Sequence, residues 1–112
     1  MTHDTEFIIQ SYISTQLKRR DIFHHGDQNA GKRGPRAQTQ MKASGACKGW
    51  PDMCIIYKGG VYWIELKTIK GSVSKEQKEV HERLAENGQS VYIVKEARKE
   101  DAWKKIQMIL NL

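Results

Sequence analysis

The sequence predicts an α/β domain in which a mixed central β-sheet is flanked by helices. Its 112 residues are enough for one domain with one modest core, so residues 1–112 are treated as a single domain. Helix-like and strand-like segments interleave in the order helix, strand, basic segment, strand, strand, helix, strand, helix. This order predicts a sheet with helices on both faces.

The first helix is predicted over residues 4–18, with position 4 or 5 as its start. Asp4 near the beginning and Lys18 near the end suit the helix dipole. A short strand is expected next, over residues 22–25. Apolar residues recur at helical spacing along one side of the helix: Ile9, Tyr12, Ile13 and Leu17.

A long basic connection follows over residues 26–49. Five basic residues against one acidic residue contribute +4 of the net charge of +6. Glycines and a proline interrupt the segment, and a short helix is expected within residues 36–43. A connection of this length is more often functional than filler, and its charge favours a polyanionic partner.

The second half of the chain begins with a predicted β-hairpin. Residues 52–57 and 61–67 (or 61–68) are apolar, β-branched and aromatic, and they flank Lys58-Gly59-Gly60 as a turn. If the turn is Gly59-Gly60, Asp52 faces Lys67. If it is Lys58-Gly59, Asp52 faces Glu65. Asp52, Glu65 and Lys67 share one face of the sheet in both registers, because side chains alternate with period two.

Two further helices and one strand complete the prediction. Ser74 begins a helix with Gln77 at its third position, which forms a capping box. That helix is expected to run to about residue 87, where Gly88 suits the position after the helix end. A strand over residues 90–94 and a last helix over residues 99–111 follow.

Asp52 and Glu65 are the candidate reactive groups. Two carboxylates about 4 Å apart repel by about 4 kcal/mol at an effective dielectric of about 20. A raised pKa, the amine of Lys67 or a divalent metal would offset this repulsion. Oxygen ligands suit Mg²⁺ or Mn²⁺. The alternative is a surface salt-bridge cluster of Lys67 with Asp52 or Glu65.

The context of these residues resembles a known family. Gly49-Trp50-Pro51-Asp52, Ile64-Glu65-Leu66-Lys67 and then Gly71, Ser74 and Gln77 resemble the virus-type replication-repair nuclease (VRR-NUC) domain of the PD-(D/E)XK nuclease superfamily. The resemblance covers roughly residues 45–94. Free-standing domains of this size resemble phage-encoded members. It implies a restriction-endonuclease-like fold and metal-dependent cleavage of DNA, often at branched or flapped structures.

The resemblance also implies roles for individual residues. Asp52 and Glu65 would ligate the metal, with the backbone carbonyl of Leu66 as a further ligand. Lys67 would orient the attacking water or stabilise charge on the phosphate. Gln77 would lie beside the catalytic lysine, although the capping box alone also explains it.

Glu6 is a further candidate metal ligand. It falls on the same helix face as the apolar stripe, where a carboxylate is expected to be near the helix end, paired or bound to metal. Related nucleases often take an extra acidic ligand from the first helix. The alternative is that Glu6 only caps the first turn.

Contacts to the DNA backbone are expected from the basic segment. Such contacts confer affinity and salt dependence but little sequence preference. The alternative is a solvated run of charge. The candidate residues are Lys32, Arg33, Arg36, Lys42 and Lys48, with His25 as an additional phosphate contact.

The expected function is that of a Mg²⁺- or Mn²⁺-dependent DNA endonuclease that prefers branched DNA, such as a four-way junction or flap. Alternatives are a non-catalytic DNA-binding module with this fold and a sequence-specific restriction-type nuclease. A homodimer is expected, since two sites are needed to resolve a junction, and Met108, Ile109, Leu110 and Leu112 offer apolar surface. No signal-peptide pattern or apolar stretch of about 20 residues is present. We therefore expect a soluble, intracellular protein, in the host cytoplasm if phage-encoded, without organic cofactor or membrane partner.

Overall fold

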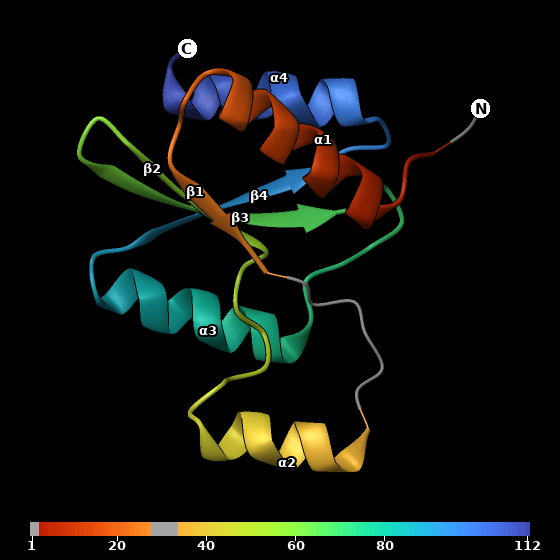
Figure 1. The fold of residues 1–112 in the computed structure, drawn as a ribbon, viewed down its shortest axis with the longest axis vertical. Helices are drawn as coiled ribbons and strands as arrows, with labels where there is room; N and C mark the ends of the chain where they lie inside the picture. Colours follow the sequence, from red (N-terminus) through yellow and green to blue (C-terminus); the bar gives the residue numbers. More distant parts are fainter. Residues whose placement is uncertain (1–2, 28–33) are drawn as a thin grey trace.

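The computed structural model describes residues 3–27 and 34–112. The elements follow the predicted order along the chain (Figure 1). Their bounds are α1 Glu6–Arg19, β1 His24–Gly26, α2 Pro35–Ala43, β2 Met53–Tyr57, β3 Gly60–Lys67, α3 Lys75–Glu86, β4 Ser90–Lys95 and α4 Lys99–Leu110.

The four strands form one mixed sheet in the order β1-β2-β3-β4. β1 and β3 both pair antiparallel with β2, whereas β4 pairs parallel with β3. α1 and α4 lie together on one face of the sheet, and α3 covers the opposite face (Figure 1). α2 lies beyond α3 and has no buried residue. The predicted α/β class, with helices on both faces, is confirmed.

The hairpin between β2 and β3 turns at Lys58-Gly59. Both residues have positive φ, 48° and 81°, which is the backbone of a two-residue turn that matches the twist of the strands. Tyr57 therefore pairs with Gly60, and Met53 pairs with Ile64. One step further along this register, Asp52 lies opposite Glu65. Of the two predicted registers, the structure has the one in which the carboxylates of Asp52 and Glu65 lie opposite each other.

The first strand begins later than predicted. Ile22 was expected inside the strand, but its backbone N–H donates to the carbonyl of Leu17 and its side chain is only 7% exposed. Asp21 has φ 55° and turns the chain sharply at the end of α1. Ile22 thus completes the end of α1 and enters the core, and pairing starts at His24.

The hydrophobic core lies between the sheet and the α1–α4 layer. Of the predicted stripe, Ile9, Ile13 and Leu17 are at most 1% exposed, and Tyr12 is partly buried against the core. From the sheet, one face of β2, β3 and β4 supplies the remaining apolar side chains, and α4 supplies Trp103 and Ile106. Within the described residues, no helix is long and apolar enough to cross a membrane.

The third helix, α3, begins and ends as its sequence predicts. Ser74 accepts from the backbone N–H of Gln77, and the Gln77 side chain accepts from the backbone N–H of Ser74, so the capping box is complete. Asn87 is the C-cap and Gly88 follows with φ 77°. In contrast to α1, this helix buries one residue, Leu84.

Candidate active site

Asp52 lies immediately before β2 and is 9% exposed. Its Oδ2 accepts a hydrogen bond of 2.7 Å from the backbone N–H of Leu66 on the neighbouring strand. This bond continues the β2–β3 ladder with a side chain in place of a main-chain carbonyl. The position of the Asp52 carboxylate is therefore set by the sheet itself.

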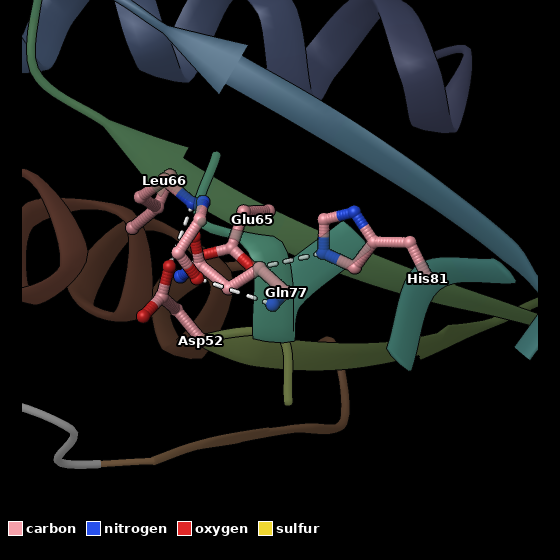
Figure 2. Close-up of polar contacts among 6 residues, drawn as sticks. Asp52, Glu65, Leu66, Gln77 and His81 are labelled. Atoms are coloured by element: carbon pink, nitrogen blue, oxygen red, sulfur yellow. Dashed lines mark hydrogen bonds and ion pairs between the residues drawn. The ribbon is translucent and has the colours of Figure 1, made fainter. Parts of the chain in front are cut away.

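Glu65 lies on β3 with its side chain fully buried. Two side chains from α3 donate to its two carboxylate oxygens. Gln77 Nε2 lies 3.1 Å from Oε2, and His81 Nε2 lies 3.0 Å from Oε1. Figure 2 shows both α3 side chains directed toward Glu65, beside the bond between Asp52 and Leu66. The carboxylate is thereby held between the sheet and the helix.

Gln77 uses both ends of its amide. Its Oε1 accepts from the backbone N–H of Ser74 at 2.9 Å, which is half of the capping box, while its Nε2 donates to Glu65. Gln77 therefore both completes the capping box of α3 and contacts the Glu65 carboxylate. A single side chain couples the start of α3 to the Glu65 carboxylate.

The electrostatics of the pair are unusual for carboxylates. The pKa of Glu65 is raised to about 9, first by burial, then by a hydrogen bond with Asp52 and by the Asp52 charge, while the Lys67 charge acts in the opposite direction. The pKa of His81 is lowered by burial and then by Lys67. At neutral pH Glu65 thus carries a proton, and His81 is a neutral hydrogen-bond donor rather than an ion-pair partner.

The Gly49-to-Asp52 motif joins the pair to α3. Gly49 has φ +100°, and a Cβ at this position would lie 2.6 Å from the backbone oxygen of Glu76. Only glycine permits both this backbone conformation and this approach to the first turn of α3. Pro51 behind it is fully buried. The motif therefore sets the spacing between Asp52 and the helix that carries Gln77.

A surface groove of about 820 Å³ reaches this site. Asp52, Lys67 and Gln77 line it together with Glu6 from the first turn of α1. The pKa of Glu6 is raised by burial and then by the charge of Asp52, which shows that the two carboxylates are electrostatically coupled. The structure therefore brings together Glu6 from α1, Asp52 from the start of β2, Glu65 and Lys67 from β3, and Gln77 from α3.

The donor set fits a hard divalent cation. Within residues 3–27 and 34–112, no three His, Cys, Asp or Glu side chains are arranged as a metal cluster. The hard oxygen donors at the site are the carboxylates of Asp52 and Glu65, the Leu66 carbonyl and, in the groove, the carboxylate of Glu6. The backbone N–H and carbonyl of one strand residue point toward the same neighbouring strand. The Leu66 carbonyl therefore points to the side of β3 on which the Leu66 N–H donates to Asp52.

The residues predicted to bind DNA are distributed over two regions. Arg36 and Lys42 are exposed on α2, and Lys48 is exposed in the loop that leads to the site. His25 lines the groove, where its Nε2 lies 2.9 Å from Oδ1 of Asp27. Two predicted contacts, Lys32 and Arg33, lie outside the described residues.

Sequence reasoning missed two residues of this region, His81 and Lys18. His81 stands four positions after Gln77 on α3, so the two side chains occupy one helix face. That spacing was a usable signal once Gln77 had been assigned to the site. Lys18 lines the groove from α1, where the sequence indicated only a favourable charge at the helix end.

Solved structures share this arrangement of elements. One described as "VRR_NUC domain protein" superposes with a TM-score of 0.70 at 24% sequence identity, covering 100% of this chain and 93% of that chain. Another, described as "VRR_NUC domain", has a TM-score of 0.60 at 18% identity and covers 91% of this chain and 94% of that chain. The chain matches no protein-family model and no curated protein. The chain has the fold of VRR-NUC domain structures, as its motifs imply.

Proposed function

We propose that this protein is a divalent-metal-dependent DNA endonuclease that hydrolyses phosphodiester bonds. The observation that carries the proposal is the buried pair of Asp52 and Glu65, of which Asp52 lines the groove together with Lys67. The pair binds one proton more than isolated carboxylates would at neutral pH. Such a site is suited to exchange that proton for a cation.

Asp52, Glu65 and the Leu66 carbonyl would hold Mg²⁺ or Mn²⁺, with Glu6 as an additional carboxylate at the groove. A bound cation supplies Lewis-acid polarisation of the phosphoryl oxygen and neutralises charge on the leaving group. Leu66 N–H, Gln77 and His81 keep the two carboxylates in place before substrate arrives. Preorganisation of this kind lowers the cost of reaching the transition state.

Lys67 would act on the substrate itself. It lines the groove with Asp52 and Gln77, and its charge influences Glu6, Glu65 and His81. Its ammonium would donate to a non-bridging phosphate oxygen or hold the attacking water. The water would release a proton to solvent as its oxygen bonds to phosphorus, and the leaving oxygen would take up a proton from solvent as its bond to phosphorus breaks.

DNA, and in particular branched DNA, is the substrate we propose, with a homodimer as the acting form. The net charge of +6 and the exposed basic residues of α2 support a polyanionic partner. Of the predicted interface residues, Leu110 belongs to the core at 3% exposure and Ile109 packs partly against it. Met108 on α4 at 78% and Leu112 after the helix end at 41% remain exposed for an interface. A monomer mass in solution at micromolar concentration would contradict the dimer.

The test is cleavage of end-labelled four-way junction, flap and plain duplex DNA with Mg²⁺, with Mn²⁺ or with EDTA. We expect cutting of the branched substrates with either metal, no cutting in EDTA, and at least a 100-fold loss for Lys67→Ala, the order of effect of one acid–base or electrostatic group. Lys95→Ala is the matched control, since Lys95 is the β4 neighbour of Lys67 in the sheet register and lies outside the groove.

Each other outcome has a definite meaning. Tight DNA binding without cleavage under every metal condition would replace the nuclease with a binding module. Cleavage that depends on sequence and ignores branching would replace the structure preference with a restriction-type activity. Equal losses for Lys67→Ala and Lys95→Ala would remove Lys67 from the chemistry.

A further inference from the structure

The groove continues well beyond the carboxylates, along one side of α1. Its wall there consists of Phe7, Gln10, Ser11, Ser14 and Lys18, which we call the α1 track. These residues lie on the side of the helix next to the buried stripe. β1 supplies the opposite wall with His24, His25 and Gly26. The proposed function does not use this part of the surface.

The α1 track carries positive charge without opposing charge of its own. Glu6 is the one acidic residue of α1, and it lies at the carboxylate end of the groove. Lys18, near the other end of the helix, is exposed. On the facing wall, Oδ1 of Asp27 lies 2.9 Å from Nε2 of His25, and Asp27 is the acidic group of that wall. An anion that enters from the Lys18 side therefore meets a cation first.

The polar groups of the α1 track are partly fixed and partly available. His24 donates through Nδ1 to the carbonyl of Ile22, since that carbonyl only accepts, and Nε2 then accepts from the Ser14 hydroxyl at 2.8 Å. These bonds make the β1 wall rigid. The hydroxyl of Ser11 makes no hydrogen bond to any residue of the described ranges. It is therefore a donor for a ligand in the groove.

The spacing along the α1 track suits a nucleic acid strand. The Gln10 amide donates to the carbonyl of Asp27 at 3.0 Å and the Ser14 hydroxyl donates to His24, which leaves Ser11 and Lys18 as the polar groups of the α1 track that can face a ligand. Four residues advance about 6 Å along an α-helix. Successive phosphates of one strand repeat on a similar scale. From Glu6 to Lys18 the helix therefore follows a strand over a few nucleotides.

Phe7 adds an aromatic surface at the carboxylate end of the α1 track. Its side chain is 66% exposed although it lines the groove. Grooves that bind single strands combine positive charge along the backbone with aromatic rings on which bases stack. The faces of a base within a duplex are covered by the neighbouring base pairs. An unpaired base has a free face that can stack on the ring of Phe7.

We propose that the α1 track binds one unpaired DNA strand next to the scissile phosphate, with its backbone toward Lys18 and a base stacked on Phe7. The inference rests on the proposed function for the position of the scissile phosphate. It adds a feature that determines substrate choice, since only DNA with an unpaired segment at the site can use the track.

Binding measured in EDTA, where no cleavage is expected, tests the contribution of the Lys18 charge to strand affinity. The probe is a fluorescently labelled ten-nucleotide single strand, compared with a hairpin duplex, and the readout is anisotropy over a range of salt concentrations. We expect Lys18→Glu to weaken single-strand binding at least 10-fold at low salt, and Lys18→Ala to reduce the salt slope by about one. Lys104→Glu, the same charge change at an exposed site on α4, is the matched control.

Stacking is tested separately with Phe7→Ala and with a 2-aminopurine base in the strand. Loss of one stacked base is expected to weaken binding about 5- to 150-fold and to remove the fluorescence quenching. Phe23→Ala is the control, because Phe23 is similarly exposed at 74% but does not line the groove. Phe7→Trp should keep both the affinity and the quenching.

Equal losses for Lys18→Glu and Lys104→Glu, or unchanged quenching in Phe7→Ala, would overturn the inference. Its failure differs from failure of the proposed function. Metal-dependent cleavage that is insensitive to Lys18 and Phe7 removes the α1 track alone. Strand binding that depends on both residues, without cleavage in any metal, keeps the α1 track and rejects the nuclease.

Discussion

The two faces of the sheet differ in what they bury. On the α1–α4 face, Met53, Ile55 and Ile64 are each at most 1% exposed. On the α3 face, Ile56 is 41% exposed and Ile93 is 49% exposed, while Glu65 is fully buried. One face thus supplies most of the apolar burial, and the other supplies a polar site. Since both faces belong to the same strands, the stability of the first holds the second in place.

The largest expected effect is on the free energy of unfolding, compared between alanine variants of two isoleucines, one on each face of the sheet. Ile64→Ala should destabilise the protein by about 2–5 kcal/mol, because it opens a cavity in the closed core. Ile93→Ala should cost about 1 kcal/mol or less, since half of its side chain is already in water. Urea unfolding of both variants measures the difference. Similar costs would show that the two faces bury apolar surface equally.

The buried Glu65 carboxyl predicts a pH dependence of stability in the metal-free protein. Its pKa rises from an ordinary value of 4.5 to about 9 on folding, so the folded state holds a proton that the unfolded state releases. The contribution of that proton is complete below the unfolded pKa and is lost as pH rises toward 9. The loss is at most about 1.4 kcal/mol per pH unit.

Thermal unfolding in EDTA between pH 5 and 8 tests this dependence. The melting temperature of the wild type should fall as pH rises, and Glu65→Gln should flatten the profile, because an amide has no proton to lose. Added Mg²⁺ should stabilise the wild type at pH 8 but not Glu65→Gln. Parallel profiles for the two proteins would show that Glu65 does not titrate in this range.

Substitution of Gly49 tests the close contact between its backbone and the first turn of α3. Gly49→Ala and Gly45→Ala both place a side chain at positive φ, but only at Gly49 does the new Cβ meet backbone atoms. The shared backbone strain is about 1–3 kcal/mol. The clash with the first turn of α3 should add about 1–3 kcal/mol for Gly49→Ala, as overpacking does elsewhere. Chemical unfolding of both variants isolates this addition, and equal costs would contradict it.

His81 is expected to act on the site rather than on stability. His81→Ala removes the donor to Oε1 of Glu65 and should weaken Mn²⁺ binding about 10- to 100-fold, as loss of a group that orients a ligand does. His81→Gln, which retains an N–H donor, should recover most of the affinity. Calorimetric titration with Mn²⁺ measures both, with His25→Ala as a histidine control in the groove. An unchanged affinity in His81→Ala would leave that histidine a purely structural role.

Local patterns predicted most of the fold. The apolar stripe of α1, the capping box at Ser74 and the glycine after α3 depend on residues close in sequence, and each is present in the structure. Ile22 was wrong as a strand residue, because its burial at the end of α1 outweighed its β-propensity. The shared face of Asp52 and Glu65 also followed from strand alternation alone.

The sequence by itself determined the element order, the hairpin and the shared face of Asp52 and Glu65, because these follow from spacing along one or two neighbouring segments. Only the tertiary structure decided the Lys58-Gly59 register, the approach of Gly49 to α3 and the contact of His81 with Glu65. It also decided that Glu6 and Lys18 line the groove of the carboxylates. These contacts depend on how helices pack against the sheet, and that packing results from many small contributions rather than from any local pattern.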